Sequence, residues 1–338
     1  MTASAFICGS SGPVLTTDEI AFYRDADPWG FILFRRNCET PAQIRALTAA
    51  MREAVGRDAP VLIDQEGGRV QRLGPPQWPA YPTGRTYGDV FARSPADGLA
   101  AARLGARLIA ADLRALGIDV DCLPVLDVPV EGAHDVIGHR AYGVTPDVVS
   151  ELGRAAAEGL LAGGVLPVIK HIPGHGRAGV DSHHHLPVVD TPRAELEATD
   201  FPPFRDGAGL PLAMTAHVVY TALDAERPAT TSKTVIDEVI RDFIGFDGCL
   251  MSDDVSMQAL SGTIGERTAA ALAAGCDLAL HCNGDLAEMR AVAAAAVPLA
   301  GRAAERAARA LACRRAPEPL DEAAARAQFA RLTGTPSV

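Results

Sequence analysis

The chain has 338 residues, of which 48% are hydrophobic and 5% aromatic, and its net charge is -11 at pH 7. This length exceeds that of most single-core domains but lies within the range of α/β barrels. Phosphate binding needs clustered basic residues, whereas Lys and Arg are dispersed along this acidic chain, so the composition argues against a nucleic-acid partner. No apolar run spans a bilayer, and the N-terminal segment lacks a basic region. We therefore expect no membrane partner and a cytoplasmic location.

The seven cysteines are an odd number and include no closely spaced pair. Most lie inside apolar runs, as Cys8, Cys122, Cys249 and Cys276 do. This pattern is typical of buried free thiols in a reducing compartment rather than of a disulfide framework.

Short apolar runs recur along the chain, and each is followed by a longer stretch with helical periodicity. They predict eight β-strands, at residues 5–8, 30–34, 61–64, 119–123, 166–170, 212–216, 248–252 and 277–281. A hydroxyl residue followed by proline predicts helix starts at Thr40-Pro41, Ser94-Pro95, Thr145-Pro146 and Thr191-Pro192. Glycines ahead of the next strand mark helix ends, as at Gly117, Gly163 and Gly275.

The alternation of strands and helices sets the expected fold. Strands joined by helical crossovers are parallel, and eight such units close into a barrel. We predict an α/β fold, a single (β/α)8 TIM-type barrel, with an open doubly wound sheet as the alternative. Residues 1–338 form one domain in this interpretation, with Ala/Arg-rich helices from about residue 285. The Arg-rich stretch from Arg302 to Arg315 is interpreted as a solvated helix rather than a functional patch.

Two aspartates come directly off apolar strands. Barrel enzymes place their chemistry on the loops after the C-terminal ends of the strands, and Asp64 and Asp253 lie there. An ionised carboxylate at such a place is costly unless it is paired or takes part in chemistry, so a structural ion pair is the alternative for either residue. Asp254 should point away from Asp253, because side chains alternate along a strand.

Basic residues lie near these aspartates in the predicted barrel. Lys170 ends the fifth predicted strand, and Arg72 and Arg140 lie in glycine-containing loops. Such donors suit sugar hydroxyls and acyl oxygens, and arginine adds a forked geometry that fixes orientation. Ion pairing with Asp64 is the alternative, and the two roles can coexist.

Six of the nine histidines lie between His171 and His217. A metal cluster is one interpretation, but the Pro and Gly residues of 173–176 interrupt any helical face and no metal-binding spacing occurs, so we predict no metal. The other interpretation pairs Asp181 with His183, since a carboxylate two residues from an imidazole can orient it and favour its protonated form. Such an imidazole can protonate a leaving oxygen.

Six motifs follow one another along the chain: GFILFRRN (30–37), DQEGGRVQR (64–72), KHIPGHG (170–176), DSHHHLP (181–187), MTAHVVY (214–220) and SDDVSM (252–257). Together they resemble the bacterial family 3 β-N-acetylhexosaminidases of peptidoglycan recycling. The resemblance runs from about residue 30 to residue 257, with all motifs in the order found in that family.

The resemblance implies a single barrel, a two-step retaining mechanism and release of terminal β-1,4-linked GlcNAc from muropeptides that contain 1,6-anhydro-N-acetylmuramic acid. It implies that Asp253 is the nucleophile, that His183 is the acid/base and that Asp181 supports it. The residues that it assigns to sugar binding are Asp64, Arg72, Arg140, Lys170 and His171. It implies no cofactor, and we expect a monomer.

Departures from the family pattern are small. Ile172 stands where the family commonly has Phe, and Ala141-Tyr142 where it has Ser-Phe, which bears on aglycone preference more than on the reaction. Three other functions stay open: a metal-dependent hydrolase, a sugar-binding barrel without turnover, and a GlcNAc phosphorylase. In a phosphorylase, a histidine in place of a carboxylate avoids repelling the phosphate.

Overall fold

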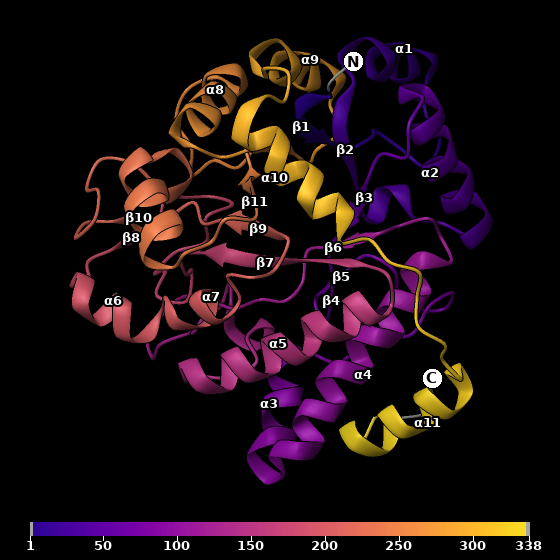
Figure 1. Cartoon of the computed structure of the whole chain (residues 1–338), viewed down its shortest axis with the longest axis vertical. Coiled ribbons are helices and arrows are strands. Elements are labelled where there is room, and N and C mark those ends of the chain that lie inside the picture. Colours follow the sequence, from indigo (N-terminus) through magenta and orange to yellow (C-terminus); the bar gives the residue numbers. More distant parts are fainter. Residues whose placement is uncertain (1–2, 336–338) are drawn as a thin grey trace.

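The computed structural model describes residues 3–335, and its core is a closed barrel of parallel strands (Figure 1). The barrel strands in chain order are β1 (Ser4–Cys8), β2 (Pro28–Leu33), β3 (Val61–Ile63), β6 (Val120–Asp121), β7 (Leu166–Ile172), β9 (Leu212–Thr215), β11 (Cys249–Asp254) and β12 (Leu278–His281). Each strand pairs with its neighbours in this order, and β12 pairs with β1 to close the ring. The predicted (β/α)8 barrel is confirmed.

All eight predicted strands are present, but the fourth is shorter than predicted. It contains only Val120 and Asp121, because the Leu123 amide turns back to the Asp121 carbonyl and Pro124, next in the chain, has no N–H to donate. Pairing with β7 resumes as an isolated bridge between Val125 and Lys170. The seventh strand is longer than predicted and runs through Asp254.

Side chains of the barrel strands alternate between two buried layers, as the pleat of a strand requires. On β9, Leu212 and Met214 belong to the cluster that fills the barrel, whereas Ala213 packs in the layer under the surrounding helices. On β11, Met251 and Leu250 divide in the same way. Both faces of each strand are therefore apolar, which is why the strands appear in the sequence as uninterrupted hydrophobic runs.

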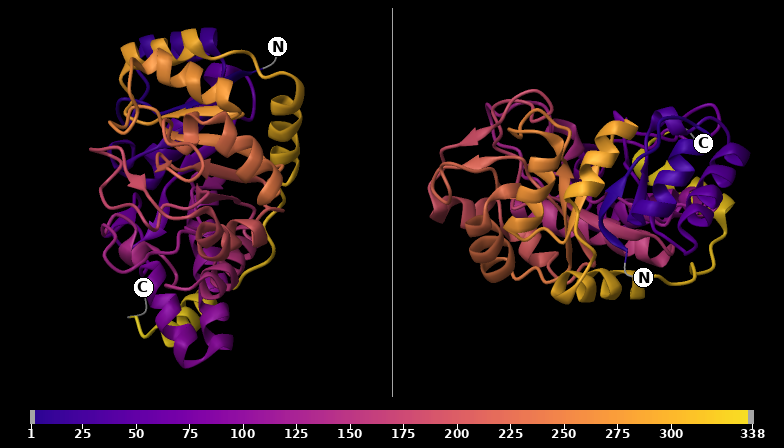
Figure 2. Two further views of the ribbon diagram at one scale, coloured as in Figure 1. Left: turned by 90° about the vertical axis from the view of Figure 1, so that its left-hand side faces the viewer. Right: turned by 90° about the horizontal axis from the view of Figure 1, so that it is seen from above.

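Helices connect and surround the strands. They are α1 (Thr17–Ala26), α2 (Pro41–Val55), α3 (Gly84–Arg93), α4 (Pro95–Arg114), α5 (Pro146–Ala162), α6 (Arg193–Thr199), α7 (Pro202–Asp206), the π-helix η4 (Val235–Phe243), α8 (Ile264–Ala274), α9 (Leu286–Ala295), α10 (Gly301–Ala312) and α11 (Glu322–Thr333). In Figure 1, α11 lies beside α3 and α4, with which it is in contact. Figure 2 shows the last segment running along the outside of the molecule from α10 to α11.

The predicted helix starts are confirmed at three of the four sites. The hydroxyls of Thr40 and Ser94 each accept a hydrogen bond from the third residue of their helices, and α5 begins at Pro146. The fourth prediction is wrong by one residue. Pro192 has an extended backbone with ψ of 142°, so α6 begins at Arg193.

Shorter elements lie in the loops that follow the barrel strands. They are η1 (Arg35–Asn37), the antiparallel pair β4 (Gln65–Gly67) and β5 (Val70–Gln71), η2 (Gly138–Arg140), the pair β8 (Val188–Val189) and β10 (Val219–Tyr220), and η3 (Ala229–Thr231). Because parallel strands all end at the same rim, these loops gather at one end of the barrel.

The state of the cysteines agrees with the expectation of free thiols in an apolar core. All seven cysteines are free, and those predicted to be buried are buried. Within residues 3–335, no helix is long and apolar enough to cross a membrane.

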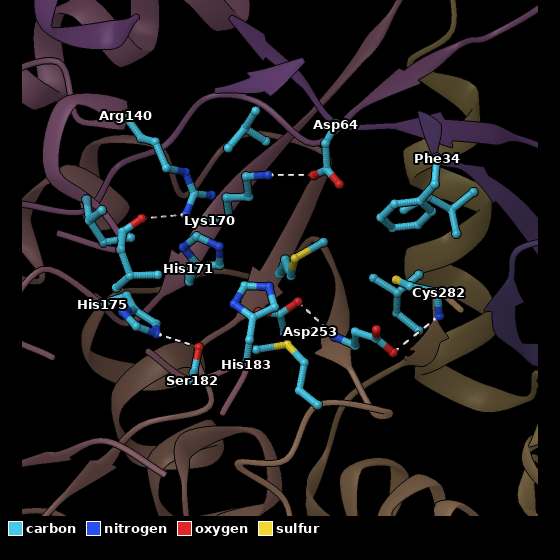
Figure 3. A pocket seen from close by; sticks show the side chains of 18 of the residues that line it. Phe34, Asp64, Arg140, Lys170, His171, His175, Ser182, His183, Asp253 and Cys282 are labelled. Carbon is cyan, nitrogen blue, oxygen red and sulfur yellow. Dashed lines mark hydrogen bonds and ion pairs between the residues drawn. The ribbon is translucent and has the colours of Figure 1, made fainter. Parts of the chain in front are cut away.

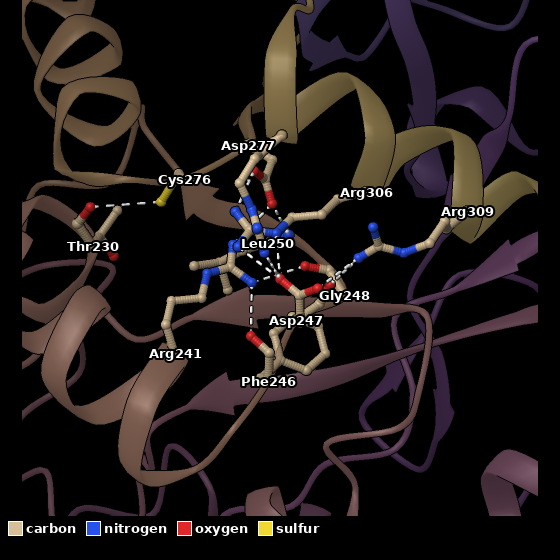
Figure 4. A network of polar contacts seen from close by, with 11 residues as sticks. Thr230, Arg241, Phe246, Asp247, Gly248, Leu250, Cys276, Asp277, Arg306 and Arg309 are labelled. Atoms are coloured by element: carbon tan, nitrogen blue, oxygen red, sulfur yellow. Dashed lines mark hydrogen bonds and ion pairs between the residues drawn. The ribbon is translucent and has the colours of Figure 1, made fainter.

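The two ends of the barrel differ. The loops at the C-terminal ends of the strands enclose a pocket (Figure 3). At the other end, α10 lies across the N-terminal ends of β11 and β12 (Figure 4). Asp247 precedes β11, and its carboxylate binds three arginines on one side of α10, which are Arg302, Arg306 and Arg309. The helix predicted for this Arg-rich stretch is confirmed, but its arginines are tied to the barrel floor and are not simply solvated.

Asp277, just before β12, is the buried member of this network. It is 3% exposed and pairs with Arg241 at 2.9 Å and with Arg306 at 3.3 Å. It also accepts a hydrogen bond of 2.9 Å from the Leu250 amide at the start of the neighbouring strand. The carboxylate therefore joins two strands, the π-helix η4 and α10.

Replacing Asp277 with Ala should lower the free energy of unfolding by about 3 kcal/mol, because it removes the buried carboxylate that Arg241, Arg306 and the Leu250 amide share and leaves that amide without an acceptor. Asp247→Ala is the matched control. Although Asp247 binds three arginines, its side chain is 53% exposed, so its loss should cost less than about 1 kcal/mol. Urea unfolding followed by circular dichroism measures both. Equal losses would show that burial is not what makes Asp277 important.

Candidate active site

The pocket at the C-terminal end of the barrel has a volume of about 210 Å³. Among the residues proposed from the sequence, those that line it are Asp64, Arg72, Arg140, Lys170, His171, His183 and Asp253. Figure 3 shows the polar side chains around the cavity, with Phe34 and Cys282 on one wall; of the residues just named, it labels Asp64, Arg140, Lys170, His171, His183 and Asp253. The fold thus brings to one cavity residues of β7 and β11 and residues from the loops after β3, β6 and β7.

Lys170 is the centre of an ion network on one side of the pocket. Its ammonium lies 2.8 Å from Asp64 Oδ1 and 2.6 Å from Glu66 Oε1. The lysine is 2% exposed, Glu66 4% and Asp64 13%, so all three charges have little contact with bulk water. Such charges are tolerated inside a protein only when each has a close partner of opposite sign.

An arginine completes the pairing of each carboxylate. Arg72 binds Asp64 at 2.9 Å, and Arg140 binds both oxygens of Glu66 at 2.8 Å. Burial alone would raise the pKa of Asp64 and of Glu66, but the surrounding cations outweigh it and lower both, that of Glu66 to about 2. The same pairing raises the pKa of Lys170 despite its burial. The ion-pair interpretation of Asp64 with Lys170 and Arg72 therefore holds, whereas Arg140 binds Glu66 instead.

A second buried carboxylate, Asp127, holds His171. Its Oδ2 lies 2.7 Å from His171 Nδ1, and its Oδ1 accepts hydrogen bonds from the backbone amides of His171 and His175. Burial would raise the pKa of Asp127, but the two histidines hold it below its ordinary value. Because an ionised carboxylate can only accept, His171 donates through Nδ1, and its Nε2 is left for a ligand in the pocket.

Asp253 and Asp254 end β11 with different surroundings. The carboxylate of Asp254 accepts from the amide and hydroxyl of Ser256 and from the Cys282 amide, so it organises the loop. Asp253 accepts only the Asp254 amide, at 2.8 Å, among the hydrogen bonds of the described residues. Both aspartates line the pocket, so they differ in what their carboxylates bind, and the expectation that Asp254 points away from Asp253 stays a prediction.

The ionisation of Asp253 follows from its neighbours. Burial would raise the pKa of Asp253, but the imidazoles of His217 and His171 and the Asp254 amide together hold it below its ordinary value. His217 is itself fixed, with Nδ1 2.7 Å from the Thr230 hydroxyl and Nε2 donating to the Asp254 carbonyl at 3.0 Å. Asp253 is therefore an ionised carboxylate that lines the pocket without an ion-pair partner among the described residues.

Asp181 and His183 form the dyad predicted from their spacing. His183 Nδ1 lies 2.7 Å from Asp181 Oδ1, which also accepts the His183 amide at 2.9 Å. Burial would raise the pKa of Asp181, but these hydrogen bonds lower it. The ionised carboxylate makes Nδ1 of His183 the donor, and its Nε2 is left for the pocket. Asp181 itself does not line the cavity, whereas His183, to which it is hydrogen-bonded, does.

Sequence reasoning missed three groups that organise the pocket. Glu66 stands two residues after Asp64, so the alternation of an extended chain was the signal that both face the same side. Asp127 lies in an apolar loop after the fourth strand, the position that had marked Asp64 and Asp253. Ser182 was visible only as part of a motif.

Within residues 3–335, no cluster of histidine, cysteine, aspartate and glutamate side chains has the geometry to hold a metal ion.

Comparison with known proteins identifies this chain as a glycoside hydrolase. The N-terminal domain model of glycosyl hydrolase family 3 matches residues 26–311, and the chain therefore belongs to that family. It is 40% identical over 277 residues to a β-hexosaminidase of Bordetella avium, covering 81% of this chain and 79% of the relative. A β-hexosaminidase of Bordetella pertussis is 39% identical over 282 residues, or 82% and 80% of the two chains.

Solved structures agree with this assignment. NagZ from Neisseria gonorrhoeae, in complex with N-trifluoroacetyl-D-glucosamine, superposes with a TM-score of 0.87 at 31% identity over 99% of this chain and 98% of that one. A family 3 β-N-acetylglucosaminidase from Paenibacillus gives 0.84 at 31% identity, over 97% of this chain and 66% of that one. The predicted fold, family and enzyme class are confirmed.

Replacing Lys170 with Met should destabilise the protein by about 3 kcal/mol or more at neutral pH, because it leaves Asp64 and Glu66 buried with mutual repulsion. The two carboxyls have lowered pKa values in the folded state, so their stabilising contribution is present above their unfolded pKa near 4 and is lost as the pH falls through the folded values. Without Lys170 those values rise, and acid unfolding should begin at a higher pH. Circular dichroism during acid titration measures the midpoint.

The other lysine of the chain is the control for this prediction. Lys233 pairs with Asp237 at 2.6 Å but is 68% exposed, so Lys233→Met should change the free energy of unfolding by less than about 0.5 kcal/mol. An acid midpoint that is the same for Lys170→Met and the wild type would contradict the role given to the buried ammonium.

Proposed function

We propose that this chain is a retaining exo-β-N-acetylglucosaminidase, which hydrolyses terminal β-1,4-linked GlcNAc from 1,6-anhydro-N-acetylmuramyl muropeptides in cytoplasmic peptidoglycan recycling. The proposal takes the chain as one domain that acts as a monomer without a cofactor. The names of its relatives support this proposal, since two are β-hexosaminidases and one is a β-N-acetylglucosaminidase. One solved relative is bound to N-trifluoroacetyl-D-glucosamine, a close analogue of the sugar.

The observation that carries the proposal is the pairing of two different groups in one pocket. Asp253 is an ionised carboxylate with no ion-pair partner among the described residues, and His183 is an imidazole oriented by Asp181. Figure 3 shows both at the centre of the pocket. Glycosidases need a nucleophile or base and an acid on the two sides of the scissile bond, and these residues supply that pair.

In the first step, an oxygen of Asp253 attacks the anomeric carbon as the bond to the leaving oxygen breaks. His183 donates its Nε2 proton to that oxygen, so the aglycone leaves as a neutral alcohol. The product on the enzyme is a covalent ester between the sugar and Asp253. Asp181, hydrogen-bonded to Nδ1, stabilises the imidazole while it carries the proton.

In the second step, the now neutral His183 accepts a proton from a water molecule, which attacks the anomeric carbon and releases Asp253. Two inversions give net retention of configuration. Most retaining enzymes use a carboxylate in the acid/base role, and here the Asp181 and His183 dyad takes it.

The ion network suits the binding of one sugar. Ion pairs with Asp64 and Glu66 hold the three basic residues rigidly, namely Lys170, Arg72 and Arg140. Their remaining N–H groups can donate to hydroxyl and acyl oxygens, and the carboxylate oxygens can accept from hydroxyl groups, without reorganising. The cavity of about 210 Å³ is smaller than the roughly 300–1,000 Å³ of sites for drug-sized ligands. This size favours a single terminal sugar and hence exo action.

Asp253→Ala should lower release of nitrophenol from its β-N-acetylglucosaminide by about 10⁴-fold or more, because it removes the covalent step. Asp254→Asn is the matched control and should lose far less, since that carboxylate serves the loop. Wild-type turnover should persist in EDTA. Turnover abolished by EDTA would instead indicate a metal-dependent hydrolase, and no turnover by the wild type would leave a sugar-binding barrel.

His183→Ala should lower kcat/KM for an N-acetylglucosaminide with an alkyl leaving group by roughly 10²–10⁴-fold, the usual contribution of a general acid. The nitrophenyl substrate needs little protonation, so its first step should be affected much less. Comparison of kcat/KM for the two substrates measures this difference.

An equal loss on both substrates would exclude His183 as the acid. The same assay with added phosphate tests the phosphorylase alternative, for which the released sugar should carry phosphate at its anomeric carbon.

A further inference from the structure

Within the catalytic triplet of residues 181–183, only the serine points into the protein. Ser182 is 3% exposed, whereas the side chains of Asp181 and His183 are 28% and 61% exposed. The mechanism uses the two outer residues and assigns nothing to the inner one. Burial of a hydroxyl between two exposed side chains requires a partner for it, because an unpaired buried hydroxyl costs free energy.

The partner of Ser182 is His175. The serine Oγ lies 3.1 Å from His175 Nε2, and both side chains are buried. Figure 3 shows this contact beside His183 and His171. The other ring nitrogen of His175, Nδ1, is buried with no hydrogen-bond partner in the described structure, so the Ser182 hydroxyl is the one polar contact of this imidazole among the described residues.

This contact is the principal link between the catalytic loop and the barrel. Among the described residues, the segment 179–186 makes one hydrogen bond or ion pair to a residue outside itself, which is the bond from Ser182 to His175. Its other hydrogen bonds are internal, such as those that the Asp181 carbonyl accepts from the amides of His184 and His185. Pairing with the body of the protein resumes at Pro187.

His175, in contrast, is fixed on a rigid base. Its amide donates to buried Asp127 at 2.7 Å, and its ring packs edge-on against His171 with centroids 5.5 Å apart. The next residue, Gly176, passes so close to Val128 that a Cβ would lie 1.9 Å from that carbonyl oxygen. Burial and the neighbouring His171 lower the pKa of His175 to about 4, so the ring is neutral at neutral pH and can share a hydrogen bond with a hydroxyl.

We infer that Ser182 and His175 are positioning residues, which hold the acid/base His183 over the pocket through a single hydrogen bond to the Asp127-supported barrel rim. The inference rests on the proposed function, in which His183 protonates the leaving oxygen. Asp127 then serves both halves of the site, because one of its oxygens orients His171 and the other holds the backbone of His175.

The test uses the full chain and compares kcat/KM for an alkyl and a nitrophenyl β-N-acetylglucosaminide. Ser182→Ala removes the hydroxyl with little change in shape and should lower kcat/KM for the alkyl substrate by about 5–10-fold, the effect of one hydrogen bond. The nitrophenyl substrate should change by less than about 2-fold, since its leaving group needs little help from an acid. His185→Ala, an exposed position on the same loop, is the matched control and should leave both unchanged.

A double-mutant cycle separates positioning of His183 from a general structural role. If Ser182 acts through His183, Ser182→Ala should have no further effect on the alkyl substrate in a His183→Ala background. Independent, multiplicative losses would overturn the inference, as would an equal loss on both substrates for Ser182→Ala alone. Failure of the proposed function gives a different result, because His183→Ala would then show no dependence on the leaving group.

Discussion

The ammonium of Lys170 is 2% exposed and contacts both Asp64 and Glu66. It sets the geometry of the ion network on one side of the pocket. Without this ammonium, the two neighbouring carboxylates would repel each other strongly. Each carboxylate also forms an ion pair with an arginine of its own. Desolvation makes such a network costly, so it is a weak source of net stability. Its value here is rigidity, because none of its members can move without leaving a charge unpaired.

The side of the pocket that holds the proposed nucleophile and acid/base is fixed in a different way. Asp253 stands on a barrel strand and is held by the backbone, whereas His183 is carried by a segment that one hydrogen bond ties to the barrel among the described residues. The hydrogen bond is worth about 1 kcal/mol, far less than the cost of separating a buried ion pair. The proposed nucleophile is therefore fixed on the barrel, as the ion network is, while the proposed acid/base is placed by a weak and adjustable contact. That arrangement fits a group that must serve first the leaving oxygen and then water.

The barrel could be predicted from the sequence because both faces of its strands are apolar. Several of its helices also begin with a serine or threonine followed by proline. Most of the pocket could be predicted as well, since a charged side chain at the end of an apolar strand is costly unless it is paired or takes part in chemistry. Partner choice was less predictable. Arg140 binds Glu66, and Asp127 supports His171. These pairings depend on how loops from different strands meet, which no local sequence pattern encodes. The role of Ser182 was hidden because a serine is ordinary in any loop, and only its burial distinguishes it.

In the proposed mechanism, Asp253 becomes covalently attached to the sugar. A fluorinated N-acetylglucosaminyl fluoride, which forms the glycosyl-enzyme quickly and releases it slowly, tests this directly when the quenched protein is analysed by mass spectrometry. We expect a mass increase of one fluorinated sugar on the peptide that contains Asp253, and no increase in Asp253→Ala. Turnover by the wild type without any adduct, or an adduct on another carboxylate such as Asp64, would contradict it.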